Sequence, residues 1–118
     1  MNKIKNIKWG LLGLFVIFAI LSLAPAANAA EKCAFTRDLD IGSEGEDVRC
    51  LQKYLNASGI TIAANGVGSP GKETTLFRAL TQEAVARWQT ENGLSPASGY
   101  FGPLSRAKYS QLVQGNSP

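Results

Sequence analysis

The chain has 118 residues, which accommodates one domain at most, and it carries a formal net charge of +3 and no histidine. The absence of histidine excludes Ser-His-Asp and Cys-His catalytic arrangements and the common histidine zinc sites. The excess positive charge sits entirely on Lys3, Lys5 and Lys8, because residues 30–118 have nine basic and nine acidic side chains. The composition therefore gives no basis for a nucleic-acid partner.

The first 29 residues are typical of an export signal. After the three lysines, Trp9 to Leu23 is uncharged and mainly apolar, and Ala27-Asn28-Ala29 supplies small residues at alternate positions. A basic head, an apolar middle and an A-x-A end predict a secretory signal peptide that is cleaved after Ala29. The alternative is an uncleaved membrane anchor, but the apolar run is short of the roughly 20 residues that span a bilayer. We therefore expect an extracytoplasmic protein, either secreted or associated with the cell wall.

Two cysteines, Cys33 and Cys50, lie beyond the predicted cleavage site. An exported chain is exposed to oxidising conditions, so we expect an intramolecular disulfide between them. In the chain-entropy description, closing a loop of this length is worth about 3 kcal/mol. The alternatives are free thiols, intermolecular pairing, or an acylated Cys33, although the charged residues before Cys33 are unlike those of a lipoprotein.

Residues 30–37 are expected to form an N-terminal lead-in, and the folded domain is expected to cover residues 38–113. Within it, Val48, Leu51 and Leu55 lie at helical spacing and predict a helix over residues 44–57. Ser43 and Glu46 have the spacing of a capping box at its start, and Gly59 is placed to end it in a left-handed conformation. Phe35, Leu39 and Ile41 are expected to make apolar contacts ahead of this helix.

A loop with three glycines and a proline follows at residues 64–75. The second predicted helix starts near Thr81 as N-cap, with Leu80 and Val85 as a hydrophobic staple, and ends at Gly93. Its buried stripe consists of Ala84, Val85 and Trp88.

The third predicted helix begins at Gly102-Pro103 or, alternatively, with Ser105 as its cap. Residues 114–118 are expected to be a disordered tail. Residues 77–85 and 101–109 resemble each other, each with an aromatic anchor (Phe77 or Phe101), a tight turn and a hydroxyl before a helix. The sequence therefore predicts an all-α fold, a small three-helix bundle with long glycine-rich loops.

Three motifs in this order resemble the peptidoglycan-binding domain family of bacterial cell-wall proteins. They are Gly42–Val48 followed by Leu51-Gln52 and Leu55, then Ala84-Val85 with Trp88-Gln89 and Asn92-Gly93-Leu94, and finally Phe101-Gly102-Pro103-Leu104-Ser105. The resemblance covers residues 38–112 and implies a three-helix fold and a role in wall binding. The chain departs from the family pattern at Arg78-Ala79, where the family often has Gly-Pro, and at Trp88, where phenylalanine is usual. No catalytic domain accompanies the three motifs.

Peptidoglycan offers carboxylates and amides on its peptide stems and flat faces on its sugars. Arginine suits carboxylates, so Arg78 and Arg106 are candidate ligand contacts, with Tyr100 for sugars and Gln52 and Gln89 for amides. The alternative for both arginines is a solvated surface position or an ion pair with Glu83. No carboxylate pair is suited to hydrolysis, because helix capping accounts for the acidic side chains. We predict a non-catalytic domain without cofactor or metal, whose partner is peptidoglycan or, alternatively, an envelope protein.

Overall fold

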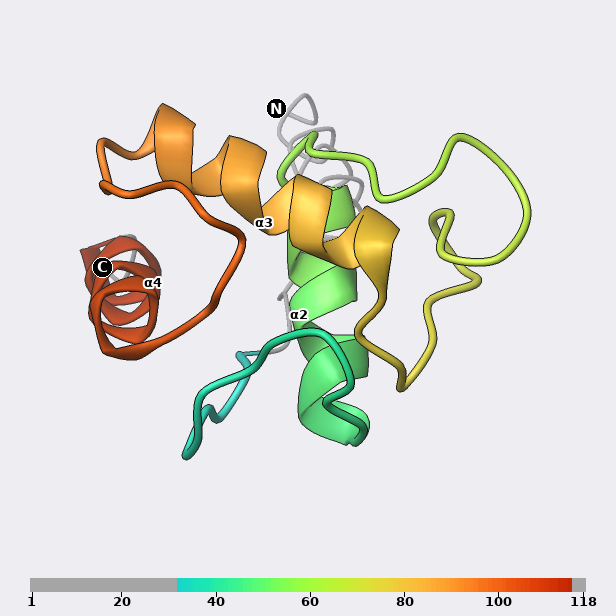
Figure 1. The fold of residues 1–118 in the computed structure, drawn as a ribbon, viewed down its shortest axis with the longest axis horizontal. Coiled ribbons are helices and arrows are strands. Elements are labelled where there is room, and N and C mark those ends of the chain that lie inside the picture. The colour runs from blue at the N-terminus through green and yellow to red at the C-terminus, as the bar shows by residue number, and fades with distance from the viewer. Residues whose placement is uncertain (1–31, 116–118) are drawn as a thin grey trace, which may run out of the picture. The chain divides into compact units, whose positions relative to one another are not determined.

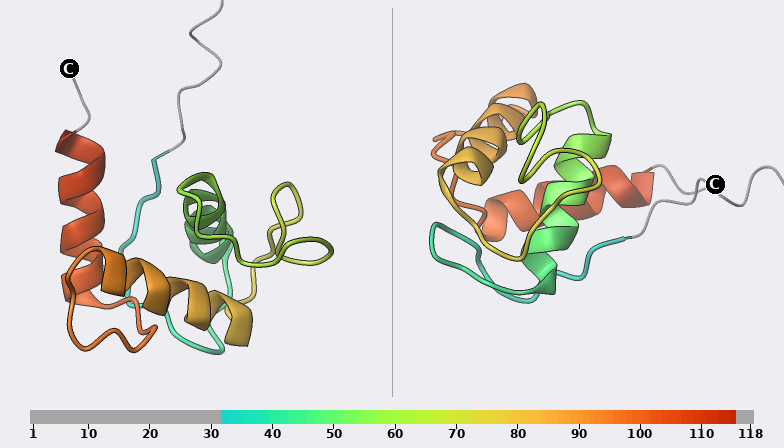
Figure 2. Two further views of the ribbon diagram at one scale, coloured as in Figure 1. Left: turned by 90° about the horizontal axis from the view of Figure 1, so that it is seen from above. Right: turned by 90° about the vertical axis from the view of Figure 1, so that its right-hand side faces the viewer.

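The computed structural model describes residues 32–115, so the predicted signal peptide over residues 1–29 lies outside the described part of the chain. The described residues form three α-helices, namely α2 (Glu46–Ala57), α3 (Ala79–Glu91) and α4 (Pro103–Gly115). This confirms the predicted all-α fold. The helices run in three different directions (Figure 1). The start of α3 lies beside the long loop after α2, and its end lies beside α4 (Figure 2).

Large aromatic and aliphatic side chains fill the core where the helices cross. Trp88, Phe77 and Phe101 are at most 1% exposed, which confirms that the tryptophan and both aromatic anchors are core residues. The predicted apolar stripe of α2 is also fully buried. The predicted contact of Ile41 is wrong, because its side chain is 54% exposed.

The capping box predicted at the start of α2 is wrong. The helix begins at Glu46 with Gly45 as N-cap, and no side chain caps it by a hydrogen bond. Ser43 is instead part of a preceding turn, in which its hydroxyl accepts a hydrogen bond from the Asp40 N–H at 3.0 Å. Its carbonyl accepts a second bond, from the Phe77 N–H, so Ser43 is held by the loop that leads to α3.

The hydroxyl caps predicted for the other two helices are also wrong. Helix α3 starts at Ala79 and α4 at Pro103, two residues before Thr81 and Ser105 respectively. Both hydroxyl residues are 2% exposed and face the core, where each accepts a hydrogen bond from a glutamine amide. Of the two starts left open for α4, the structure therefore has the one at Pro103. Leu80 does not form a staple, because it is 51% exposed.

The glycine stops of the first two helices are confirmed. Gly59 and Gly93 have φ values of +87° and +72°, which glycine adopts without the steric cost of a Cβ. In each case the N–H of the next residue donates back to the helix, at 2.9 Å from Ile60 to the Leu55 carbonyl and at 2.9 Å from Leu94 to the Gln89 carbonyl. These bonds satisfy carbonyl groups that would otherwise lack a partner.

The segment before α2 holds both aromatic anchors through its backbone. Leu39 and Phe101 exchange two N–H···O hydrogen bonds of 2.9 Å, in an isolated antiparallel bridge. The Gly42 N–H donates to the Phe77 carbonyl, also at 2.9 Å. The segments that lead into α3 and α4 are thereby both fixed to the residues that precede α2.

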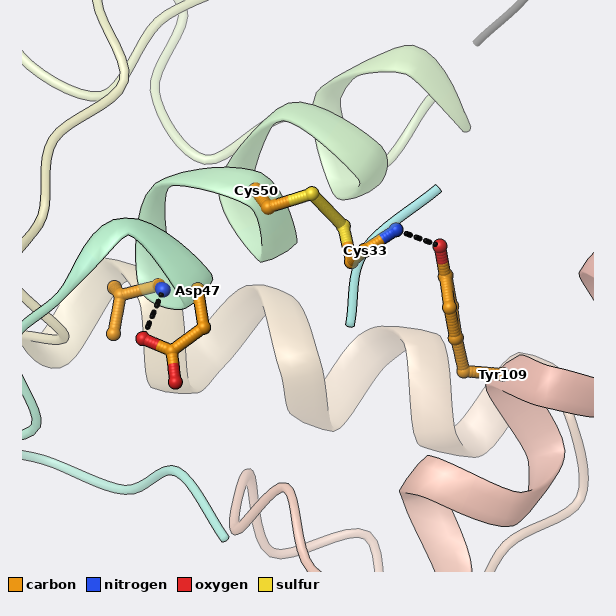
Figure 3. The surroundings of a disulfide bond; sticks show 5 residues. Cys33, Asp47, Cys50 and Tyr109 are labelled. Carbon is orange, nitrogen blue, oxygen red and sulfur yellow. Dashed lines mark hydrogen bonds between the residues drawn. A yellow bond between two sulfur atoms is a disulfide. The ribbon is translucent and has the colours of Figure 1, made fainter. Parts of the chain in front are cut away.

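A disulfide and an aromatic cluster fix the N-terminal segment against the helices. Cys33 and Cys50 are bonded with their Cα atoms 5.7 Å apart, which confirms the predicted intramolecular pairing and leaves no thiol for acylation. The Cys33 N–H donates to the Tyr109 hydroxyl of α4 at 2.8 Å (Figure 3). Phe35 of the predicted lead-in packs on Tyr109 and Phe101, with ring centroids 5.0 and 4.9 Å away.

Helix α4 makes its main aromatic contact with α2, where the rings of Tyr109 and Tyr54 meet edge to face at 4.8 Å. It continues to Gly115 and so includes the first two residues of the predicted disordered tail. The last three residues lie outside the described range.

Candidate ligand-binding site

Two buried glutamines hold the loops that lead into α3 and α4. Gln52 donates its amide to the Leu76 carbonyl at 3.0 Å and the Thr81 hydroxyl at 2.9 Å, and its side-chain oxygen accepts from the Thr74 N–H at 2.6 Å. From the middle of α2, the amide thus fixes a carbonyl, an N–H and a hydroxyl of a segment that is distant in sequence. A primary amide suits this task because it is both a double donor and an acceptor.

Gln89 repeats this arrangement at the second junction. It donates to the Tyr100 carbonyl at 2.8 Å and the Ser105 hydroxyl at 2.9 Å, and it accepts from the Gly99 N–H at 2.8 Å. Gln52 and Gln89 are 1% and 3% exposed. Because their amides are fully engaged inside the protein, neither glutamine presents a polar group to a ligand, and we leave both out of the candidate site.

Arg106 and Tyr100 are held together by a carboxylate that the sequence analysis did not connect with them. Asp38 accepts a hydrogen bond from the Tyr100 hydroxyl and forms an ion pair with Arg106, at 2.5 Å between Oδ1 and the guanidinium. The alternative partner Glu83 is therefore wrong for Arg106. The hydrogen bond from Tyr100, assisted by Arg106, lowers the pKa of Asp38, and the same bond raises the pKa of Tyr100.

Acid is expected to remove the stabilisation that Asp38 provides. Because its folded pKa lies below the unfolded value near 3.9, ionised Asp38 stabilises the fold above that value, and this contribution is lost as the pH falls through the folded pKa. In urea unfolding, Asp38→Asn should therefore be less stable than the wild type at pH 6, and the difference should shrink at pH 2.5. A difference that stays constant between these pH values would contradict the assignment.

Arg78 occupies a different environment, between two open hollows at the start of α3. One hollow, of about 460 Å³, is bordered by Ile62, Val67, Leu76 and Leu80. The other hollow, of about 480 Å³, is bordered by Ile41 and Gly42. Arg78 and Leu76 border both hollows. We define the Arg78 surface as Arg78 with the aliphatic residues of both hollows, namely Ile41, Ile62, Val67, Leu76 and Leu80.

The Arg78 surface is positively charged. The Arg78 side chain is exposed, and its guanidinium forms no hydrogen bond or ion pair with any residue between 32 and 115. Only its backbone carbonyl is engaged, by the Gln82 N–H of α3. It is the residue before α3, whose N-terminus has no side-chain cap and adds partial positive charge. Among residues 32–115, no acidic side chain borders either hollow. Such a surface is suited to an anionic ligand that also has apolar groups.

The corresponding hollow at the second junction is smaller, at about 120 Å³. Leu104 stands there in the place of Leu80, and Gly102 stands in the place of Arg78. The Tyr100 ring lies so close to Gly102 that a Cβ at that position would be 2.5 Å from a ring carbon. The second junction therefore has neither the cation nor the space of the first.

A model of the family described as "Putative peptidoglycan binding domain" matches residues 44–108, which is more than half of the 118-residue chain. The chain belongs to this family. The matched residues include Gln52 and Gln89, which we call the glutamine clamps, both aromatic anchors and Arg78. Cys33 of the disulfide and Leu39 of the backbone bridge lie before the matched range. No curated protein and no solved structure matches the chain significantly.

In this peptidoglycan-binding domain, the structure separates the five residues that were expected to contact ligand. Only Arg78 has an exposed side chain without a hydrogen bond or ion pair to residues 32–115, while the side chains of the other four form internal hydrogen bonds. Sequence reasoning missed the aliphatic part of the site, because Ile41, Val67 and Leu80 are isolated apolar residues in loops or at a helix start. Their exposure, between 51% and 75%, is the signal that identifies them.

Proposed function

We propose that this protein is an exported, non-catalytic module that binds peptidoglycan through the Arg78 surface. Membership of a peptidoglycan-binding family supports the choice of partner. The observation that carries the location is an exposed arginine with no internal partner among residues 32–115, placed between two apolar hollows. Peptide stems, with their carboxylates and alanine methyl groups, match this combination.

The state of the carboxylates supports a role without catalysis. A glycosidase needs a pair of carboxyl groups flanking a cleft, one of them with a raised pKa. Here Arg37 binds Asp47 through two hydrogen bonds of 2.8 and 2.9 Å, and this contact lowers the pKa of Asp47. Asp38 is likewise paired, and its pKa is lowered. Neither has the properties of a general acid.

Export is the second part of the proposal, with cleavage after Ala29. An intramolecular disulfide supports an oxidising location for the mature domain. None of the helices within residues 32–115 has the length and apolar character that a membrane span requires. Mass spectrometry of the exported protein should give the mass of residues 30–118 with one disulfide. A mass that includes the first 29 residues would contradict cleavage.

Wall binding is expected to depend on Arg78. When the purified protein is centrifuged with isolated sacculi, it should appear in the pellet, and Arg78→Ala should weaken the binding about tenfold or more through loss of charge-assisted hydrogen bonds. Lys108→Ala is the matched control, because it removes one positive charge from α4 and borders neither hollow. Wild-type protein that stays in the supernatant would contradict the proposed function.

An envelope protein is the second candidate partner, and the exposed aliphatic side chains around Arg78 favour it. Apolar patches on small domains are often protein contacts. A pull-down from envelope extract that recovers one protein through Arg78, with no binding to purified sacculi, would support this candidate over peptidoglycan.

A further inference from the structure

We propose that the Arg78 surface recognises the free carboxylate at the end of a short peptide with small aliphatic side chains, and that the sugar chain is not its ligand. This inference rests on the proposed wall-binding function and specifies which part of the wall polymer is bound. It assigns the carboxylate to the guanidinium of Arg78 and the aliphatic side chains to the neighbouring hollows.

The first support is the contrast between Arg78 and the chain's other arginines. Arg37 and Arg106 form ion pairs with aspartates, and Arg49 pairs with Glu46 at 3.0 Å. Arg87 donates to the Thr61 carbonyl at 2.9 Å. Each of these four guanidinium groups thus has an oxygen partner inside the protein. Arg78 has none among residues 32–115, so a carboxylate from a ligand would supply the missing partner.

The second support is the aliphatic character of the two hollows. Val67 and Leu80, exposed at 75% and 51%, border the first hollow, and Ile41, exposed at 54%, borders the second. The aromatic residue at the edge of these hollows is Phe77, which is 1% exposed and belongs to the core. Methyl groups pack well on such aliphatic surfaces, whereas the surface offers no open aromatic ring for the face of a sugar.

The third support is the second junction, which acts as an internal comparison. It has the same glutamine clamp and an equivalent exposed leucine, Leu104, but Gly102 replaces the arginine and Tyr100 covers it. The clamp and the leucine are therefore features of the repeated unit, and the cation and the larger hollow are particular to the first junction. We accordingly infer a carboxylate site at the first junction and none at the second.

The experiment is a titration of the purified, isotope-labelled protein, followed by the shifts of its amide signals in nuclear magnetic resonance spectra. The probes are N-acetyl-alanyl-alanine in its L,L and D,D forms, the corresponding C-terminal amides, and the neutral β-1,4 disaccharide of N-acetylglucosamine. At least one form of the acid should bind at a single site and shift the signals of Arg78 and Leu80. The C-terminal amide should bind more weakly than the acid by a factor of about ten or more, because it lacks the negative charge.

The variants separate charge from shape. Arg78→Lys, which keeps the charge but not the planar fork, should retain part of the affinity, and Arg78→Ala should lose about tenfold or more. Because Arg78 is exposed, the spectra of both variants should otherwise match that of the wild type. Leu104→Ala, at the second junction, should bind the acid as the wild type does.

Two results would overturn the inference. One is equal binding of acid and amide, and the other is binding of the disaccharide, without the acid, at the Arg78 surface. If sacculi retain the protein while neither form of the acid binds, the ligand class proposed here is wrong and the wall-binding function stands. If sacculi do not retain the protein, the function itself fails, whatever the peptides do.

Discussion

Replacing Gln52 by leucine is expected to destabilise the fold by about 3–5 kcal/mol, because several buried polar groups lose their partners at once. The side chain satisfies the Thr74 N–H, the Leu76 carbonyl and the Thr81 hydroxyl, and leucine has a similar volume but no polar atom. A small domain has a total stability of about 5–15 kcal/mol, so this loss would bring it close to unfolding. Urea unfolding followed by circular dichroism measures the effect.

The same substitution at Gln89 should have a similar effect, because it holds the second junction in the same way. Gln111→Leu is the control, since Gln111 is exposed on α4 and should change stability little. Thr81→Val in combination with Gln52→Leu should recover part of the loss, because it removes the hydroxyl that the first substitution leaves unpaired. A loss below 1 kcal/mol at both glutamines would show that the clamps do not hold the fold.

Removal of the disulfide by Cys33→Ser with Cys50→Ser is expected to cost about 2–4 kcal/mol. The bond closes a sequence separation of 17 residues, and it also keeps the N-terminal segment in place over the aromatic cluster. Without it, residues 33–35 keep only non-covalent contacts, namely the hydrogen bond to the Tyr109 hydroxyl and the packing of Phe35 on Phe101 and Tyr109. The thermal unfolding midpoint of the double variant, compared with that of the wild type, measures the loss.

Loss of the disulfide should increase the local opening of some segments more than that of others. Tyr109 connects α4 to both the N-terminal segment and Tyr54 of α2, so amide hydrogen exchange should accelerate most in α4 and in residues 32–38. Reduction of the wild type by a phosphine reductant should reproduce the double variant and serves as its control. Equal stability of the oxidised and reduced protein would contradict the structural role of the bond.

The parts of the fold that were predicted correctly depend on the local chemistry of single residues, on a single possible cysteine pairing, or on a repeated sequence pattern. Gly59 and Gly93 end helices because their conformations are difficult for other residues, and this property is visible in the sequence. The disulfide was predictable because two cysteines allow a single intramolecular pairing. Phe77 and Phe101 were found because the same short pattern occurs twice around them.

Two of the incorrect helix caps have a shared physical cause, which is competition from a distant partner. Thr81 and Ser105 have the local chemistry of helix caps, but buried glutamines on other segments bind their hydroxyls. Similarly, Asp38 holds Tyr100 across a separation of 62 residues, which no local pattern reveals. For the site, the sequence identified a cation at Arg78, but it gave no way to know that the other candidates serve the fold.

Chemical-shift mapping with soluble peptidoglycan fragments tests the central claim most directly, because it reports both binding and the face that binds. With the purified, isotope-labelled protein, we predict saturable shifts concentrated at Ile41, Leu76 and residues 78–80. The signals of α4 and of the disulfide region should remain almost unchanged. The absence of shifts, or shifts confined to α4 and the N-terminal segment, would contradict binding through the Arg78 surface.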